Sequence, residues 1–528
     1  DNFVNNVHIT TPKNLIIMIG DGMGTVYNTA YRHYKGQDRT YLDHIFKGRY
    51  STDPLNNTIT DSAAGATAFS IGKKTFNGNI ATDVHGNPFG TILEALKRKG
   101  KGTGLVVTKS ITDATPASFA SHTLNRNFQD LIAKQLATLH QDYGWKNCTV
   151  TDILMGGGKR FFDSWGFNES SYSDYGWNKY LNDNGTLYTL CPEDLPVIGL
   201  FADNELPFYL DLIHTENNQP SLLDMSRISI DLLNKTYNDE GFFMMIEGSR
   251  IDSCGHMNDI ACILWEMEQF IEAVDYVIDW AREDGETLVV VLADHQTGGL
   301  TIGREDSFEK DKLFDGYSLN GMTEEDILEY YGDYKVNPLV TSKDSDAITT
   351  TTYQWHPEAI KDIKYTSQWF NQTVTAANGT MDILSILHLI EDRWYPLSAK
   401  EKAFLNYTFV NGGKMDQALV HITNVRTVTG FTSHGHTAVD VSLYAMGVSA
   451  DSFYGHWRND EIGQLLSRIM DCVEEQNEQT SLLQNMFVNG TLELCDPKQK
   501  PPILEYNNSV PYPFGNLRYP QNCVENWM

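Results

Sequence analysis

The sequence predicts an α/β fold in which helices pack against a large, mostly parallel sheet. Three observations lead to this prediction. Short, uninterrupted apolar runs end at glycines or carboxylates, as buried parallel strands do. Segments with helical periodicity lie between these runs, and such alternation is typical of a parallel sheet. The 528 residues are too many for one small core but fit a single large α/β domain, 1–528, that carries insertions.

The first predicted strand covers residues 14–19, and its apolar run leads to Asp21 in a glycine-rich turn. A carboxylate at the carboxyl end of a buried strand lies where open α/β sheets bind their ligands. Residues 90–100 then follow a helical pattern, with basic residues late and Gly100 as a stop signal. Residues 104–108 form the next apolar strand, so these segments predict a strand–helix–strand unit.

The same alternation continues through the first three hundred residues. Further strands are predicted near residues 152–155, 197–202, 242–246 and 287–293. A helix at about 260–283 separates the last two, because its apolar residues recur at intervals of three and four. A late strand at about 438–446 is predicted from the alternation of Val439, Val441 and Leu443.

Two segments do not continue the alternation. Residues 304–425 are rich in Tyr, Asp, Asn and Thr, and we predict that they form an insertion that caps the site. Residues 496–528 are rich in proline, which predicts an irregular C-terminal arm on the surface.

The chain is strongly acidic, with 40 Lys and Arg against 69 Asp and Glu and a net charge of −29. This balance argues against nucleic acid or an anionic membrane as the main partner. An anionic substrate would need local cations, which a cluster of metal ions could supply. No apolar run approaches the roughly 18–20 residues that span a bilayer, so we predict no transmembrane segment.

Ten Asn-X-Ser/Thr sequences favour a glycosylated protein of the secretory pathway. We expect an extracellular or cell-surface location first, and a vacuolar lumen second. The candidate acceptors are Asn56, Asn147, Asn168, Asn184, Asn234, Asn371, Asn378, Asn406, Asn489 and Asn507.

The seven cysteines include no C-x-x-C pair, which argues against a zinc ribbon or a thioredoxin motif. An odd number leaves at least one thiol free or intermolecular. We expect bridges between Cys148 and Cys191 and between Cys472 and Cys495, while Cys254 is either paired or a thiol sensitive to oxidation.

Residues 59–68 place Ser62 between Asp61 and a run of very small residues. Small residues let a ligand approach closely. The run can also start a helix, whose unpaired N–H groups and partial positive charge suit an anion such as phosphate. Taken alone, the stretch fits equally a buried Ala-rich helix that Asp61 caps. The choice depends on the rest of the chain.

Carboxylates and imidazoles gather where the predicted strands end. The candidates are Asp21, Asp113, Thr115, Glu247, Asp252, His256, Asp294, His295, His434 and His436. Zinc takes Asp and His ligands when sulfur is absent, and Glu, Asp and Thr oxygens suit magnesium. Asp252 and His256 are four residues apart and could bind one ion from the same helical face. Each residue alone would more often be a cap or a core residue, but together they predict a metal cluster.

The order and content of these motifs resemble the alkaline phosphatase family, mainly over residues 14–303 and 430–447. The likeness is carried by residues 21–24, 60–67, 113–117, 247–256 and 294–295, and by His436. The surroundings of Asp113 and His436 look most like the eukaryotic, fungal-type branch. The resemblance implies a three-layer α/β/α sandwich with a crown-like insertion, and a homodimer.

The resemblance also implies a site with two Zn²⁺ ions and one Mg²⁺ ion. Ser62 matches the nucleophile, which would form a phosphoserine, and Arg126 matches the arginine that holds the phosphate. The matching metal ligands are Asp21, Asp294 and His295 for the zinc that activates Ser62; Asp252, His256 and His436 for the second zinc; and Asp21, Thr115 and Glu247 for magnesium, with Asp113 acting through water.

Two positions near this set leave a choice. His434 competes with His436 as a zinc ligand, and the residues that follow His436 favour His436. Asp61 matches the family motif, and we expect it to orient its neighbours rather than to bind a metal.

The implied activity is hydrolysis of small phosphate monoesters at alkaline pH, with broad specificity. One alternative is a phosphodiesterase or a sulfatase on the same kind of scaffold. The sulfatase is disfavoured because Ala63 and Ala64 follow Ser62, and phosphodiesterase relatives usually have Thr as the nucleophile. Another alternative is a glycosylated binding protein with a degenerate site, which the presence of every proposed ligand argues against.

Overall fold

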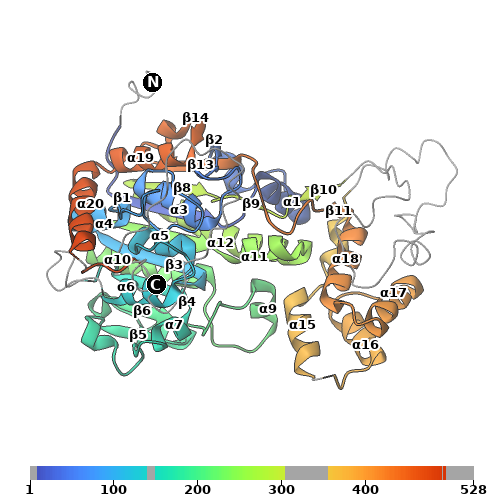
Figure 1. The fold of residues 1–528 in the computed structure, drawn as a ribbon. Helices are drawn as coiled ribbons and strands as arrows, with labels where there is room; N and C mark the ends of the chain where they lie inside the picture. Colours follow the sequence, from blue (N-terminus) through green and yellow to red (C-terminus); the bar gives the residue numbers. More distant parts are fainter. Residues whose placement is uncertain (1–8, 139–148, 304–354, 378, 490, 495–528) are drawn as a thin grey trace, which may run out of the picture.

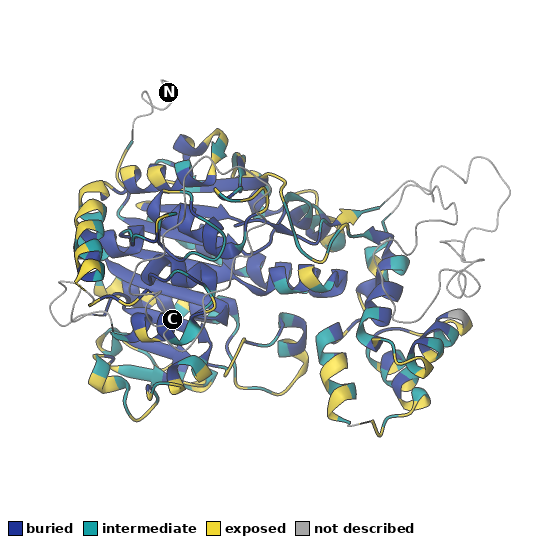
Figure 2. Cartoon of the chain, viewed as in Figure 1, coloured by how far each residue is buried: buried dark blue, intermediate teal, exposed yellow. Residues whose placement is uncertain are grey.

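A computed structural model of the chain describes residues 9–138, 149–303, 355–377, 379–489 and 491–494. A ten-stranded sheet lies at the centre, and a group of helices extends from one side of it (Figure 1). The central strands are buried, while exposed residues lie on the outer helices and loops (Figure 2). Within the described residues, no helix is both long and apolar enough to cross a membrane.

The central sheet is mixed but mostly parallel. Its strands are β1 (Asn14–Gly20), β2 (Phe46–Ser51), β3 (Gly102–Ser110), β4 (Ile153–Gly157), β5 (Lys179–Leu181), β6 (Val197–Leu200), β7 (Phe242–Gly248), β8 (Thr287–Leu292), β13 (Val441–Gly447) and β14 (Gly455–Arg458). They lie in the order β14-β2-β13-β8-β1-β7-β3-β4-β6-β5. Only β13 runs against its neighbours, β2 and β8, while the other neighbouring pairs are parallel.

Helices cover both faces of the sheet. One layer contains α1 (Thr25–Lys35), α9 (Tyr209–His214), α10 (Leu222–Thr236) and α12 (Ile260–Asp284), and α10 and α12 pack on β7. The other contains α3 (Ser62–Ile71), α4 (Ile92–Arg98), α5 (Ala114–Ala120), α6 (Gln129–Thr138), α19 (Asn459–Ile469) and α20 (Val473–Val488), and α4 and α5 pack on β3. The predicted three-layer α/β/α fold is therefore confirmed.

Short elements connect these layers. They include α2 (Tyr41–His44), α7 (Lys159–Asp163), α8 (Asn184–Leu187) and α11 (Arg250–Met257). Two small ribbons pair β9 (Gln296–Thr297) with β12 (His436–Thr437), and β10 (Thr301–Ile302) with β11 (Thr429–Gly430). The ribbon of β9 and β12 is important for the site, because it brings a late segment of the chain next to the end of β8.

The described part of the predicted insertion is helical. It contains α15 (Ser367–Ala376), α16 (Ile383–Arg393), α17 (Ala399–Val410) and α18 (Met415–Thr427), which lie together away from the sheet (Figure 1). Asn424 donates a hydrogen bond to the carbonyl of Asn258, and Asp259 accepts one from the backbone of Ser367. These contacts attach the helices next to the end of α11. Residues 304–354 and the predicted arm at 496–528 lie outside the described residues.

The predicted strands of the first three hundred residues and the helix at 260–283 are confirmed, with ends shifted by a few residues. The late strand differs from its prediction. Val439 is exposed and precedes β13, and every residue from Val441 to Ala445 is buried. The alternation is absent because β13 lies inside the sheet, between β2 and β8, where helices cover both of its faces.

Of the two alternatives predicted for Cys254, the paired cysteine is confirmed. Cys254 forms a disulfide with Cys262, which joins α11 to the start of α12. Cys191 and Cys472 have free thiols among the described residues, and the bridges expected to Cys148 and Cys495 stay predictions. Those two expected partners lie outside the described residues. Sequence separation alone could not identify the pair, because the contact depends on how the chain turns at the end of α11.

Candidate active site

The candidate site lies at the carboxyl ends of four neighbouring strands, β8, β1, β7 and β3. Asp21 follows β1, and Asp294 and His295 follow β8. Glu247 is near the end of β7, and Asp252 comes just after it on α11. Because parallel strands present their carboxyl ends at one edge, the sheet brings these distant residues together.

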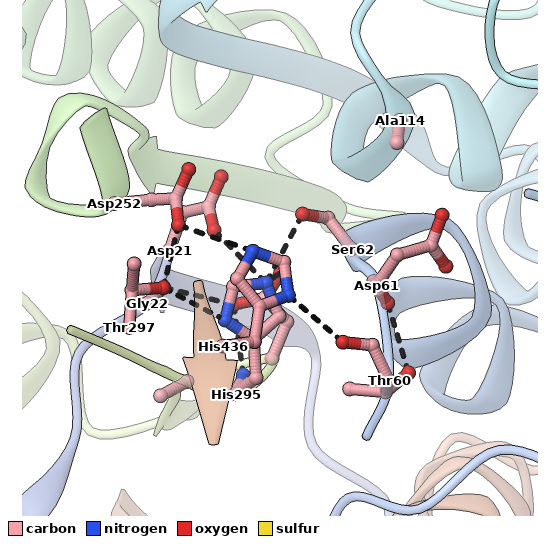
Figure 3. Close-up of polar contacts among 12 residues, drawn as sticks. Asp21, Gly22, Thr60, Asp61, Ser62, Ala114, Asp252, His295, Thr297 and His436 are labelled. Carbon is pink, nitrogen blue, oxygen red and sulfur yellow. Dashed lines mark hydrogen bonds and ion pairs between the residues drawn. The ribbon is translucent and has the colours of Figure 1, made fainter. Parts of the chain in front are cut away.

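Ser62 is the first residue of α3, and the preceding Asp61 caps that helix. Asp61 Oδ1 accepts a hydrogen bond of 3.0 Å from the backbone N–H of Ala64. Gly65 lets the helix lie against the end of β8, since a Cβ there would be only 3.2 Å from the carbonyl oxygen of Asp294. The predicted helix start is therefore confirmed, and it points Ser62 toward the strand ends (Figure 3).

Asp21, Asp294 and His295 form a first cluster whose ligand atoms all lie within 4.8 Å of one another. Nε2 of His295 is 3.1 Å from Asp294 Oδ2, 3.6 Å from Asp21 Oδ1 and 3.2 Å from Ser62 Oγ. Oδ1 of Asp21 and Oδ2 of Asp294 are buried and accept no hydrogen bond from the described residues. Buried carboxylate oxygens in that state fit a divalent cation.

Asp252, His256 and His436 form a second cluster. The helical turn that was predicted to bring Asp252 and His256 together is present in α11, and their side chains approach to 3.4 Å. Nε2 of His436 lies 3.2 Å from Nε2 of His256. The ring of His436 stacks on that of His295, with centroids 3.5 Å apart, so the two clusters adjoin (Figure 3).

Backbone carbonyls orient the two imidazoles of the second cluster. Nδ1 of His256 donates to the carbonyl of His434, and Nδ1 of His436 donates to the carbonyl of Thr60 at 2.8 Å. These bonds leave each Nε2 lone pair directed at the cluster, as a metal ligand requires. Burial and the neighbouring His295 lower the pKa of His436 to about 4, so it is neutral at neutral pH. The structure thus brings His436 into the cluster, while His434 contributes its carbonyl.

Thr115, Glu247 and Asp113 provide oxygen atoms beside the two clusters. Thr115 Oγ1 and Glu247 Oε2 are buried and have no hydrogen-bond partner in the described part of the chain. Burial raises the pKa of Glu247 to about 8. Asp113 caps α5 and Thr115 lies in its first turn, so both are fixed at the end of β3. This oxygen-rich set fits a hard cation such as Mg²⁺.

Arg126 lies at the edge of the site and links two of the predicted residues. Its Nη1 is 3.3 Å from Asp61 Oδ2, and its Nη2 is 3.0 Å from Asp113 Oδ1. Although burial lowers the pKa of Arg126, the two carboxylates raise it above its ordinary value. About 25% of the side chain remains exposed.

Lys109, at the end of β3, is a further site residue that was not predicted from the sequence. Its Nζ is 3.3 Å from Asp21 Oδ2, 3.0 Å from Asp252 Oδ2 and 4.0 Å from Asp113 Oδ2. Although burial lowers the pKa of Lys109, the carboxylates raise it well above its ordinary value. A charged residue in a strand that is buried along its whole length is the signal that could have identified it.

Thr297 was also missed. Its hydroxyl donates a 2.6 Å hydrogen bond to Asp252 Oδ1 and lies 3.2 Å from Nδ1 of His295. It therefore orients one side chain from each cluster. No sequence signal identified it, because the contact depends on the pairing of β9 with β12.

The carboxylates of the two clusters are close enough to change each other's ionisation. Burial and the neighbouring Asp294 raise the pKa of Asp21 above its ordinary range. Although burial raises the pKa of Asp252, the positive charge of Lys109 holds it below its usual range. A site with this much buried negative charge is stabilised by cations.

The chain is similar to known alkaline phosphatases over most of its length. A family model described as alkaline phosphatase matches residues 12–472. Alkaline phosphatase 3 of Bacillus subtilis is 36% identical over 471 residues, which cover 86% of this chain and 87% of the relative. Repressible alkaline phosphatase of Saccharomyces cerevisiae is 31% identical over 521 residues, which cover 90% of this chain and 83% of the relative.

A solved structure agrees with these relatives. The cold-active alkaline phosphatase of Shewanella sp. superposes with a TM-score of 0.69 and 30% identity, covering 87% of this chain and 99% of that chain. Sequence, fold and site geometry lead to the same conclusion: the chain belongs to the alkaline phosphatase family.

Proposed function

We propose that this chain hydrolyses a broad range of phosphate monoesters at alkaline pH, through a phosphoserine on Ser62. The observation that carries the proposal is the 3.2 Å contact between Ser62 Oγ and His295 Nε2. It puts a hydroxyl at a helix N-terminus next to a cluster with the composition of a zinc site. Membership of the alkaline phosphatase family supports the same reaction.

The metal content that we propose is two Zn²⁺ and one Mg²⁺. Asp21, Asp294 and His295 would hold one zinc, and Asp252, His256 and His436 would hold the other. Asp21, Thr115 and Glu247, with Asp113 through water, would hold magnesium. The buried oxygens that have no hydrogen bond from any described residue support this assignment. Bound ions would make hydroxyl groups easier to deprotonate and neutralise the charge of the transferred phosphoryl group.

The other side chains of the site would carry out the phosphoryl transfer and hold the phosphate. Ser62 Oγ would attack phosphorus, so that a bond from Oγ to phosphorus forms while the bond to the alcohol breaks. Water would then attack the phosphoserine, release inorganic phosphate and restore the Ser62 hydroxyl. The fork of Arg126 would pair with two phosphate oxygens, and Asp61 and Asp113 would hold that fork in place. Positioning and charge dominate catalysis of phosphoryl transfer.

The direct test compares three chromogenic substrates at alkaline pH: p-nitrophenyl phosphate, bis(p-nitrophenyl) phosphate and p-nitrophenyl sulfate. We expect the monoester to be cleaved on the order of a hundredfold faster than the diester or the sulfate. EDTA should abolish the activity, and added zinc should restore it. A preference for the diester or the sulfate would contradict the proposal, as would full activity in a protein shown to be metal-free.

We also propose that the protein is a glycosylated homodimer of the secretory pathway, extracellular or at the cell surface, with a vacuolar lumen as the second choice. The disulfide between Cys254 and Cys262 supports an oxidising compartment. Asn371, Asn406 and Asn489 are exposed acceptors. A mass decrease on treatment of the native protein with an endoglycosidase, and light scattering at low concentration, test these two points.

A further inference from the structure

Lys109 places a positive charge among the carboxylates that are proposed to bind metal ions. Its Nζ contacts Asp21, Asp252 and Asp113 at 3.3, 3.0 and 4.0 Å, and its side chain is 8% exposed. The three carboxylates come from different elements, after β1, on α11 and before α5. The ammonium therefore joins the three segments that carry most of the proposed ligands.

The two oxygens of Asp21 have different surroundings. Oδ1 faces the first cluster, 3.6 Å from His295 Nε2, and makes no hydrogen bond in the described part of the molecule. Oδ2 is the oxygen that Lys109 contacts. Asp113 and Asp21 both belong to the proposed magnesium set. The ammonium thus occupies the side of Asp21 that a third ion would share with Asp113.

The ion pairs of Lys109 do not include Thr115 or Glu247, the other two members of the proposed magnesium set. Thr115 Oγ1 and Glu247 Oε2 are buried and without hydrogen bonds among the described residues, so they remain available to an ion. Magnesium requires nearly octahedral oxygen coordination at about 2.1 Å. An ion that completes such a shell with Asp21 must come close to the ammonium, and two cations at that distance in a buried pocket repel each other.

We propose that Lys109 is a resident cation that competes with magnesium for the carboxylates of the third metal site. When magnesium is absent, the ammonium offsets part of the negative charge of Asp21, Asp252 and Asp113 and keeps the site assembled. When magnesium binds, the flexible stem of the lysine moves the ammonium away from Asp21. Magnesium is therefore weakly held and exchangeable, whereas the two zinc ions are held firmly. This inference rests on the proposed function, since it assumes the zinc pair.

The test measures magnesium affinity in the zinc-loaded protein by titration calorimetry with MgCl₂. In Lys109→Met, a side chain of similar length without charge, we expect Mg²⁺ to bind at least about tenfold more tightly than in the wild type, because the competing charge is gone. The matched control is Lys101→Met. Lys101 is a buried lysine that directly precedes the first residue of β3. Its Nζ donates to the carbonyls of Lys13 and Glu240 rather than to carboxylates. Its removal should leave the affinity for Mg²⁺ unchanged.

A second measurement separates this role from a general loss of stability. After removal of all metals, Lys109→Met should melt at a lower temperature than the wild type, because Asp21 and Asp252 then lose the ammonium and Asp113 keeps only Arg126 as an ion-pair partner. Saturating Mg²⁺ should remove most of that difference. Lys101→Met should lower the melting temperature equally with and without Mg²⁺. If Lys109→Met does not fold, Lys109→Gln serves in both measurements.

Equal or weaker binding of Mg²⁺ by the variant would overturn the inference, as would a wild type that keeps one Mg²⁺ per chain through desalting. The zinc content and the monoesterase activity of the same wild-type preparation test the proposed function separately. A protein with two zinc ions, full activity and tightly held magnesium would refute the role of Lys109 alone.

Discussion

Ser62 Oγ lies 3.2 Å from Nε2 of His295, although 233 positions separate the two residues in the sequence. The contact joins the first turn of α3 to the end of β8. It depends on Gly65, which lets the helix approach Asp294, and on Asp61, which fixes the start of the helix. The candidate nucleophile and the first cluster are therefore parts of one rigid arrangement.

Ser62→Ala should lower the turnover of p-nitrophenyl phosphate by about a thousandfold or more, because it removes the hydroxyl that is proposed to accept the phosphoryl group. Its zinc content should remain that of the wild type, since alanine keeps the helix start. The control is Ser70→Ala, on the same helix, whose hydroxyl donates to the carbonyl of Thr67 within the last turn. Metal analysis and steady-state kinetics measure both variants. Turnover near the wild-type rate in Ser62→Ala would remove the nucleophile assignment.

Arg126→Ala should raise KM for phosphate monoesters and weaken inhibition by inorganic phosphate about ten- to a hundredfold. The loss corresponds to a charge-assisted, two-point contact. Arg32→Ala is the control, because it breaks a comparable ion pair, with Asp43, on another part of the molecule. If the inhibition constant of phosphate is the same in Arg126→Ala and the wild type, then Arg126 does not bind phosphate.

Replacing Cys254 and Cys262 with serine should destabilise the protein by about 2–3 kcal/mol, since the closed loop is short. The bridge ties α12 to the helix that carries Asp252 and His256, so the second cluster should also hold zinc less tightly. Thermal melting in the presence of chelator and zinc competition measure the two effects. Cys191→Ser removes an exposed, free thiol and should change neither quantity. A double variant as stable as the wild type would show that the bridge is not structural.

The buried Glu266 gives the stability a dependence on pH. Burial raises its pKa to about 7, although a hydrogen bond from Tyr209 and the charge of Arg250 oppose this shift and the nearby Asp211 adds to it. The folded state keeps the proton that the unfolded state releases near pH 4.5, so this contribution to stability falls as the pH rises from about 4.5 to 7. Glu266→Gln cannot ionise and lacks this fall.

The stability of Glu266→Gln relative to the wild type should therefore increase by about 3 kcal/mol between pH 4.5 and pH 8. Melting temperatures across this range measure the change. Glu286→Gln, on the surface, should follow the wild type at every pH. A constant difference between Glu266→Gln and the wild type would show that Glu266 has an ordinary pKa.

Local patterns predicted the parts of the fold and the site that depend on neighbouring residues. The apolar run before Asp21 predicts β1 because a strand buried on both faces needs an uninterrupted run. The spacing of Asp252 and His256 predicts their shared face because one helical turn sets it. Asp61 before a run of small residues predicts a cap, and the cap is present.

Other features depend on contacts between distant segments, and local patterns could not predict them. Val439 follows the alternation of a half-buried strand, yet the position of β13 between two strands decides its burial. The disulfide partner of Cys254 depends on the turn between α11 and α12. Lys109 lies in the site because of the position of β3 in the sheet, next to β7. Thr297 lies there because β9 pairs with β12.

The central claim is that two zinc ions lie beside Ser62, each held by one of the clusters. A crystal structure of the active protein with anomalous scattering at the zinc edge tests it most directly. We predict two peaks, one among Asp21, Asp294 and His295 and the other among Asp252, His256 and His436. Zinc peaks at other positions, or an active crystal without zinc at either cluster, would contradict the account.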